Sequence, residues 1–143
     1  MHTRIIEHNS DDYEQMIQLR LSQLLEPIGV PASYIKKENE KTDILIGTFE
    51  DEEIIGCCIL TPIDDEVIQL RQMAVRSNYR GKGIGGAIIE FAEQVAKENR
   101  FSILRMHARD PVIDFYKKCG YEIYGEQFFE VGIGHHKMQK QLS

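Results

Sequence analysis

The stretch from Val67 to Glu98 reads VIQLRQMAVRSNYRGKGIGGAIIEFAEQVAKE, and the rest of the chain is interpreted from it. A strand-like run ends at Val75, and a basic, glycine-rich turn follows over residues 80–86. From Ile84 onward the apolar residues recur at helical spacing, which predicts an amphipathic helix. Strand, glycine-rich turn and helix together form a geometry that binds phosphate through backbone N–H groups and a helix N-terminus.

The strand in this stretch has an irregular pattern. Ile68 and Leu70 share one face, whereas Met73 and Val75 lie on the other face if the alternation continues. A β-bulge near residues 71–72 would bring all four to one face, and a strand end that is apolar on both faces explains the pattern equally well. A bulge would also release backbone N–H groups from the sheet to bind a ligand.

Length and composition predict one domain spanning residues 1–143, in which 42% of the residues are hydrophobic. The net charge of −6 argues against nucleic-acid binding and against an anionic membrane surface. No run approaches the roughly 18 apolar residues of a membrane-spanning helix, and the N-terminus lacks the apolar segment of a signal peptide. A cytoplasmic location is therefore expected.

The three cysteines give no sign of a disulfide framework or a zinc site. Cys57 and Cys58 are adjacent within an apolar run, Cys119 stands alone, and no CxxC spacing occurs. Buried free thiols are the expected state. The pair His135–His136 is too short a cluster to indicate a metal site, so no metal is predicted.

The remaining segments predict a mixed α/β (α+β) domain. Strands are expected near residues 3–8, 43–50, 53–61, 66–75, 101–108, 121–125 and 135–142. Helices are expected at residues 13–25, at 84–98 and at 111–118, the last with Asp110 as N-cap and Pro111 in the first turn. Residues 31–42 are polar and fit either a loop or a short helix.

Several phosphate-binding motifs compete for the glycine-rich turn. A Walker A loop is excluded, because Ala87 and Ile88 follow where a Lys–Ser/Thr pair is needed. Gly81, Gly83 and Gly86 match the dinucleotide fingerprint GxGxxG literally, which keeps an NAD-dependent oxidoreductase as a weaker alternative. Three strands precede the motif, however, and no acidic residue follows about 20 residues later. A turn that merely connects strand and helix is the remaining interpretation.

The run MAVRSNYRGKGIGG at residues 73–86 closely resembles the acetyl-CoA-binding segment of the GNAT superfamily of N-acetyltransferases. The family pattern Q/R-x-x-G-x-G/A is met by Arg80, Gly83 and Gly85. A second run, FYKKCGY at residues 115–121, resembles the family motif FYxxxGF/Y. The tail over residues 125–138 is similar to the ElaA-like branch of the superfamily.

This resemblance implies the GNAT acyl-CoA N-acyltransferase fold, a mixed central sheet of about six to seven strands flanked by about four helices. It also implies acetyl-CoA as co-substrate. N–H groups and the dipole of a helix N-terminus can neutralise the CoA pyrophosphate, and an extended pantetheine arm can pair with a strand edge. The cofactor-binding residues expected on this basis are Met73, Ala74, Val75, Arg80, Gly81, Lys82, Gly83, Ile84, Gly85, Gly86, Arg109 and Tyr116.

The resemblance further implies catalytic roles. The Met73 N–H would polarise the thioester carbonyl, and Tyr116 would protonate the leaving thiolate. The family often has asparagine seven residues before this tyrosine, where this chain has Arg109, which could contact CoA or the acceptor instead. The general base is not evident. His107 is the preferred candidate, followed by Glu130 and His135.

The expected function is therefore N-acetyl transfer from acetyl-CoA to a primary amine, by direct attack in a ternary complex. A non-catalytic acyl-CoA-binding module is the alternative, because no base is obvious. The acceptor, a small-molecule or peptide amine, would contact residues 13–25, 31–42 and 130–135, whose acidic and apolar residues suit a small cationic amine. A homodimer is one of the oligomeric states that stay open.

Overall fold

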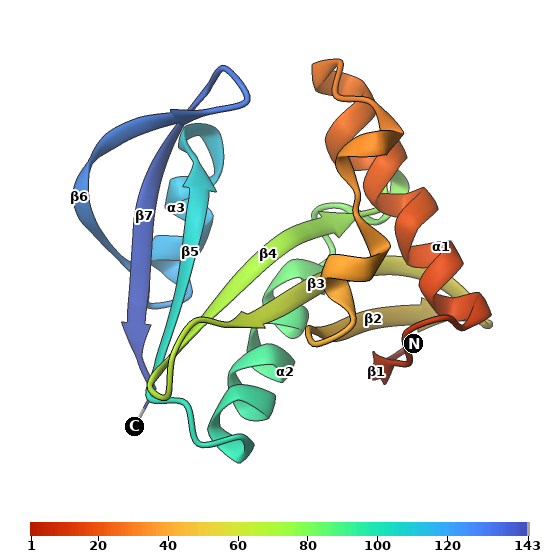
Figure 1. The fold of residues 1–143 in the computed structure, drawn as a ribbon, viewed down its shortest axis with the longest axis horizontal. Coiled ribbons are helices and arrows are strands. Elements are labelled where there is room, and N and C mark those ends of the chain that lie inside the picture. Colours follow the sequence, from red (N-terminus) through yellow and green to blue (C-terminus); the bar gives the residue numbers. More distant parts are fainter. Residues whose placement is uncertain (143) are drawn as a thin grey trace.

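A computed structural model describes residues 1–142 and contains one seven-stranded mixed sheet in the order β1-β2-β3-β4-β5-β7-β6 (Figure 1). This confirms the expected fold class, at the upper end of the expected number of strands. All neighbouring strands run antiparallel except β4 and β5, which are parallel. The strands are β1 (His2–Ile6), β2 (Ile44–Glu50), β3 (Glu53–Pro62), β4 (Val67–Val75), β5 (Ile103–Arg109), β6 (Glu122–Glu130) and β7 (Ile133–Gln141).

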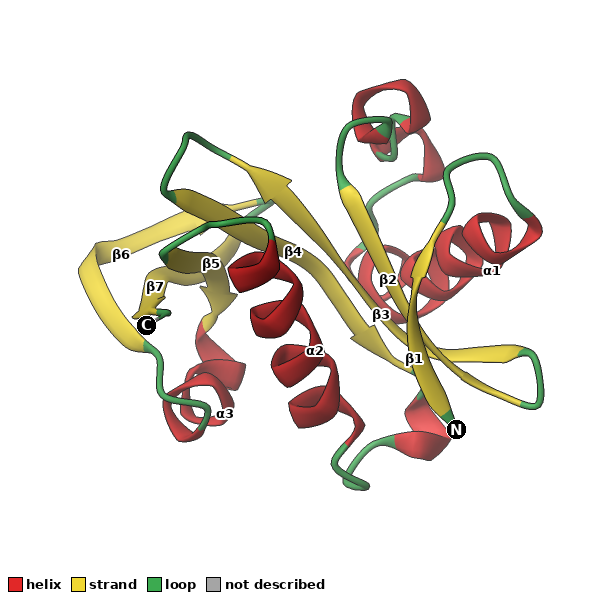
Figure 2. Ribbon diagram, turned by 90° about the horizontal axis from the view of Figure 1, so that it is seen from below, coloured by secondary structure: helices red, strands yellow, loops and turns green. Residues whose placement is uncertain are grey.

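Helices cover both faces of the sheet. Helix α1 (Asp11–Arg20) lies on one face and α2 (Ile84–Glu98) on the other, as Figure 2 shows, and α3 (Ile113–Lys118) lies beside β5. One buried cluster joins α1 to β2 and β3, and a second joins α2 to β3, β4 and β5. Within residues 1–142 these are the three α-helices, and short 3₁₀ turns occupy 32–34 and 37–40, where the sequence left a loop or helix open.

Two expected helix boundaries were wrong. The first helix ends at Arg20, and a π-helical turn, Leu21–Leu25, continues it to the segment that contains Pro27. Asp110 is not the N-cap of α3, because Asp110–Val112 form a 3₁₀ turn and the Asp110 carboxylate instead accepts a hydrogen bond of 2.7 Å from His136 Nδ1. No helix among the described residues is long and apolar enough to cross a lipid bilayer.

Strands β4 and β5 separate halfway along their length. They pair from Val67 with Ile103 as far as Leu70 with Met106, although β4 continues to Val75 and β5 to Arg109. Figure 1 shows the two strands diverging toward α3 and the turn after α1. Within residues 1–142, the β5-facing edge of residues 71–75 has no strand partner, so its backbone groups face the space between the diverging strands.

The irregular pattern in β4 is a β-bulge. Cys57 pairs with Ala74 and Ile59 with Arg71, so one residue of β3 faces two residues of β4, Gln72 and Met73. Gln72 has a φ of 53°, in the left-handed region. The extra residue brings Met73 against the cluster under α2, which also contains Ile68 and Leu70, whereas Ala74 packs toward α1. The bulge hypothesis is thereby confirmed.

Candidate active site

The space between the diverging strands is a cavity of about 860 Å³. Its walls come from β4, from the turn and first residues of α2, from β5 and α3, and from residues 23–34 after α1. A volume of this size is typical of a pocket for a cofactor or a small-molecule ligand. The cavity therefore joins every segment that the sequence motifs singled out.

The N-terminus of α2 opens into this cavity. Gly83 is the N-cap with a φ of 79°, no side chain caps the helix, and the first helical hydrogen bond runs from Ala87 N–H to the Gly83 carbonyl. The preceding N–H groups are thus outside the helical ladder, where they and the helix dipole can hold an anion. A side chain at Gly85 would lie 3.1 Å from Phe115 Cζ, so close packing favours glycine there.

Arg80 connects this turn to the segment after α1. Its Nη2 donates to Gln23 Oε1 at 2.9 Å, and its Nε lies 3.3 Å from the Val75 carbonyl. Arg80 is thus held at the cavity wall. Lys82 does not line the cavity, and its ammonium lies 5.3 Å from the centre of the Tyr79 ring. The other residues expected to bind the cofactor or to catalyse the reaction line the cavity: Met73, Ala74, Val75, Gly81, Gly83, Ile84, Gly85, Gly86, His107, Arg109 and Tyr116. Of the three segments expected to contact the acceptor, only part of each lines it: Gln23, Leu24, Leu25, Tyr34, Glu130, Val131 and His135.

Tyr116 is buried at the α3 side of the cavity, with 8% of its surface exposed. Its hydroxyl lies 3.8 Å from the Met73 sulfur, next to the bulge. Burial raises the pKa of Tyr116 above its ordinary value, so the hydroxyl keeps its proton at neutral pH. It can therefore donate a proton to a group that develops negative charge in the cavity.

The three candidates for the general base, His107, Glu130 and His135, lie together in the structure. His107 Nδ1 lies 3.3 Å from Glu130 Oε1, and His135 Nε2 lies 3.7 Å from Glu130 Oε2. Phe128 packs against both imidazole rings, with ring centroids 5.1 Å and 5.6 Å away. Pairing of β5 with β7 and of β7 with β6 creates this cluster, which the order of residues along the chain does not reveal.

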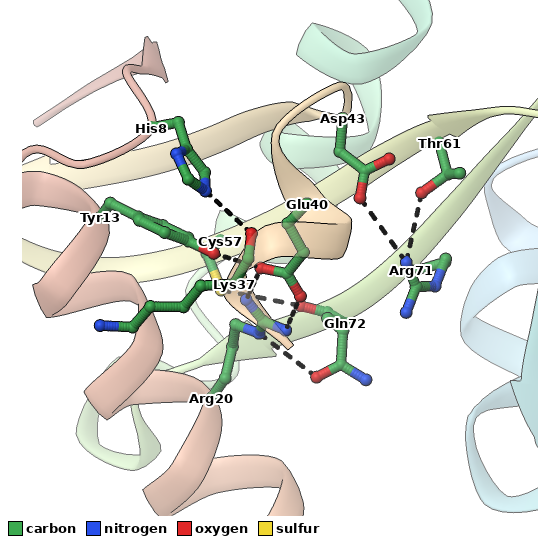
Figure 3. A network of polar contacts seen from close by, with 10 residues as sticks. All are labelled: His8, Tyr13, Arg20, Lys37, Glu40, Asp43, Cys57, Thr61, Arg71 and Gln72. Atoms are coloured by element: carbon green, nitrogen blue, oxygen red, sulfur yellow. Dashed lines mark hydrogen bonds and ion pairs between the residues drawn. The ribbon is translucent and has the colours of Figure 1, made fainter. Parts of the chain in front are cut away.

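A buried polar network holds the bulge in β4 (Figure 3). Glu40 accepts hydrogen bonds from both terminal nitrogens of Arg20, at 2.9 and 2.7 Å, and from the Tyr13 hydroxyl at 2.6 Å. Arg20 Nε also donates to the Gln72 side chain at 3.3 Å, and the Cys57 thiol lies 3.7 Å from the Gln72 carbonyl. The network thus connects Gln72, which has a positive φ, to Arg20 on α1 and through it to Glu40.

Arg109 is the last residue of β5 and lines the cavity between β4 and β5. Its Nη2 lies 3.4 Å from the Leu24 carbonyl, across the cavity mouth. Phe115 and Val112, to which the sequence assigned no role, also line the cavity, as does Tyr34 from the segment 31–42 that was expected to contact the acceptor. Phe115 could have been found from the FY motif, but nothing in the sequence indicated Val112.

The model of the acetyltransferase (GNAT) family matches residues 5–121. The chain belongs to this family. The acetyltransferase is 26% identical to the uncharacterized N-acetyltransferase YjcF of Bacillus subtilis, over 95% of this chain and 97% of that protein. It is also 32% identical to the uncharacterized YyaT of Bacillus subtilis, over 52% of this chain and 51% of that protein.

Solved structures share the fold of this acetyltransferase. Escherichia coli ElaA superposes with a TM-score of 0.85 at 17% identity, covering 98% of this chain and 99% of ElaA. An aminoglycoside 6'-N-acetyltransferase complexed with coenzyme A superposes with a TM-score of 0.84 at 16% identity, covering 100% of this chain and 98% of that enzyme. At these identities the likeness concerns the fold alone. As a GNAT acetyltransferase the protein uses acetyl-CoA, which fits the cavity volume and the uncapped helix N-terminus.

Proposed function

We propose that the protein transfers the acetyl group of acetyl-CoA to a primary amine by direct attack of the amine within a ternary complex. The observation that carries this proposal is the separation of β4 from β5 beyond Leu70 and Met106. It leaves one cavity that reaches the unpaired edge of β4, the N-terminus of α2, the Tyr116 hydroxyl and the His107 cluster.

The Met73 N–H on β4 and the Tyr116 hydroxyl on α3 are the proposed contacts of the thioester. Acetyl-CoA supplies an activated acetyl group. The Met73 N–H, at the bulge, would stabilise negative charge on the carbonyl oxygen, an interaction worth roughly 3 kcal/mol for one such donor. Tyr116 would donate its proton to the departing thiolate, while the remaining cofactor contacts in Arg80–Gly86 hold the pyrophosphate.

His107 is the proposed general base. The amine must lose a proton, and the cluster supports His107 in this role because Glu130 can orient its ring. Glu66, the acidic residue nearest to β4 along the chain, lies before the strand begins, and its carbonyl accepts hydrogen bonds from Ser102 and Ile103. Glu130 then acts through His107 as a positioning residue.

Direct attack is favoured over a covalent enzyme intermediate. In residues 1–142 none of the three cysteines lines the cavity. Burial raises the pKa of the Cys57 thiol to about 12, and burial also raises the pKa of Cys58 and Cys119. These thiols stay protonated at neutral pH and are poor nucleophiles.

The base is tested by the variant His107→Gln. We expect kcat to fall about 100-fold, since general-base catalysis typically contributes this much, while the KM for acetyl-CoA stays close to the wild-type value. His136→Gln is the matched control, because His136 is bonded to Asp110 and does not line the cavity. A kcat in His107→Gln close to that of the wild type would rule out His107 as the base.

The alternative is a non-catalytic acyl-CoA-binding module. A panel of amines, amino acids and peptides, with CoA release as readout, separates the two functions. Acceptor-dependent release supports the acetyltransferase, and binding of acetyl-CoA without release for any acceptor supports the module. Thermal shift with CoA and NAD in parallel tests the oxidoreductase alternative.

We also propose that residues 1–143 form one domain, because both buried clusters pack on opposite faces of the same sheet. The cytoplasmic location, the homodimer and the absence of nucleic-acid and membrane partners stay predictions. Sedimentation of the purified protein measures the oligomeric state.

A further inference from the structure

The active-site cavity continues into a smaller recess of about 230 Å³ beside α1. Tyr34, Arg71 and Gln72 line both spaces, so they mark the junction between them. Arg71 lies on β4 two residues before Met73, where the thioester carbonyl is proposed to sit. A group held by Arg71 would therefore belong to the amine acceptor, and the inference that follows rests on the proposed acetyl transfer.

Part of the Arg71 guanidinium is available to a ligand. Its side chain is 37% exposed, and Nη1 lies 3.3 Å from Thr61 Oγ1 and 3.7 Å from Asp43 Oδ2 (Figure 3). Among the contacts of residues 1–142, its Nε and Nη2 have no hydrogen-bond partner. Asp43 thus positions one corner of the guanidinium and leaves the rest facing the junction.

The carboxylates around both spaces are already engaged. In residues 1–142 the only carboxylates that line them are Glu40 and Glu130. Glu40 is bonded to Arg20 and Tyr13, and Glu130 lies against two histidines. A second positive charge on the acceptor would meet only carboxylates that already have partners, so these spaces favour a negative group beside the amine over a further cationic one. A negative group would meet Arg71, with Lys36 exposed at the rim of the recess.

We propose that the acceptor is an amino carboxylic acid whose carboxylate is bound by Arg71 while its amine faces Met73. A planar guanidinium binds a carboxylate through paired N–H groups, and a charge-assisted contact of this kind is stronger than one to a neutral amide. Arg71 is then a specificity-determining residue, and the recess accommodates the part of the acceptor beyond the carboxylate.

The test compares α-, β- and γ-amino acids with their carboxamides, which have nearly the same size and no negative charge. We expect kcat/KM for at least one chain length to favour the acid about 10- to 100-fold, the range for a charge-assisted hydrogen bond. In Arg71→Gln this ratio should fall to about 1. The double variant Arg71→Gln/Asp43→Asn should show the same ratio of about 1. It serves as a second test because it does not leave the buried Asp43 carboxylate without its cation.

Arg105→Gln is the control, because Arg105 lies on β5, donates to Gln69 Oε1 at 2.9 Å and lines neither space. It should keep the preference for the acid. Carboxamides used as well as acids at every chain length, or a preference that persists in both Arg71 variants, would overturn the proposal. Calorimetry compares the binding of acids and amides with CoA present, and this comparison is available even if no acceptor is acetylated. A lack of acetylation would count against the proposed acetyl transfer, whereas equal binding of acids and amides would count against the role of Arg71.

Discussion

Tyr116 brings a protonated hydroxyl to within 3.8 Å of the Met73 sulfur inside the cavity. If this proton goes to the leaving thiolate, Tyr116→Phe should lower kcat about 100-fold, a usual contribution of general-acid catalysis. The ring remains in place, so the Kd of acetyl-CoA should change by less than about threefold, since only one hydroxyl is lost. Steady-state kinetics and calorimetry measure the two quantities.

Tyr121→Phe provides the comparison for this substitution. Tyr121 is also buried and packs against Tyr116 with ring centroids 6.3 Å apart, but its hydroxyl donates to Glu93 and it does not line the cavity. Its kcat should stay close to that of the wild type. If Tyr116→Phe also retained wild-type kcat, the leaving thiolate would need no proton from Tyr116.

At the scale of elements, the glycines at the start of α2 have different physical roles. Gly83 has a φ of 79°, so Gly83→Ala should lower the free energy of unfolding by about 1 kcal/mol, the cost of a left-handed alanine. Gly86 lies within the helix, and a Cβ there would meet no atom within 4 Å. Gly86→Ala should therefore raise the free energy of unfolding by roughly 0.5–1 kcal/mol.

Urea denaturation measures both glycine variants against the wild type. Gly86→Ala should also weaken acetyl-CoA binding, because the added methyl group stands where the backbone must approach the pyrophosphate. A stabilised Gly86→Ala that binds acetyl-CoA as tightly as the wild type would contradict the placement of the pyrophosphate at this helix end.

At the scale of the whole molecule, the Arg20–Glu40 pair joins α1, the segment before β2 and the bulge of β4. Burial favours the neutral acid, but the hydrogen bonds from Arg20 and Tyr13 outweigh it and lower the pKa of Glu40. Removing one charge of a buried pair costs about 3–5 kcal/mol, so Glu40→Gln should destabilise the protein by about this amount at pH 7.

This loss should depend on pH with a defined sign. Because the folded pKa of Glu40 is lowered, its stabilising contribution is present above the ordinary value of 4.5 and disappears as the pH falls through the folded pKa. The difference between wild type and Glu40→Gln should therefore shrink below about pH 4.5 in urea titrations followed by circular dichroism.

Glu38→Gln is the surface control for this prediction. Glu38 is paired with Lys41 on the exposed side of the same segment, and its substitution should change stability little. A single cooperative transition is expected for all variants, as for one domain. A difference for Glu40→Gln that stayed constant down to pH 3 would contradict a charged, buried Glu40.

The sequence predicted the fold and the glycine-rich turn that lines the cavity because both depend on local patterns. Helix α2 was expected at residues 84–98 and begins and ends there, since its apolar spacing and the flanking glycine and asparagine act over neighbouring residues. The shift of apolar residues between Leu70 and Met73 indicated a bulge but left an alternative open. Pairing with β3 decided between them.

The proposed acceptor end of the site required tertiary structure. His107, Glu130 and His135 were separate candidates along the chain, and strand pairing across β5, β7 and β6 brought them together. Glu40 lies in a polar segment that the sequence associated with a cationic amine. In the structure its carboxylate is buried and forms an ion pair with Arg20.

By itself, the amino-acid sequence determined the family, the glycine-rich turn and the catalytic tyrosine candidate, because motif spacing and helical periodicity are properties of adjacent residues. Only the tertiary structure decided where β4 and β5 separate, which charges are already paired and that the Arg71 guanidinium is partly exposed at the cavity. Those properties depend on contacts between residues far apart in the chain, such as Arg20 with Glu40 and Arg71 with Asp43, whose charges determine what the cavity can bind.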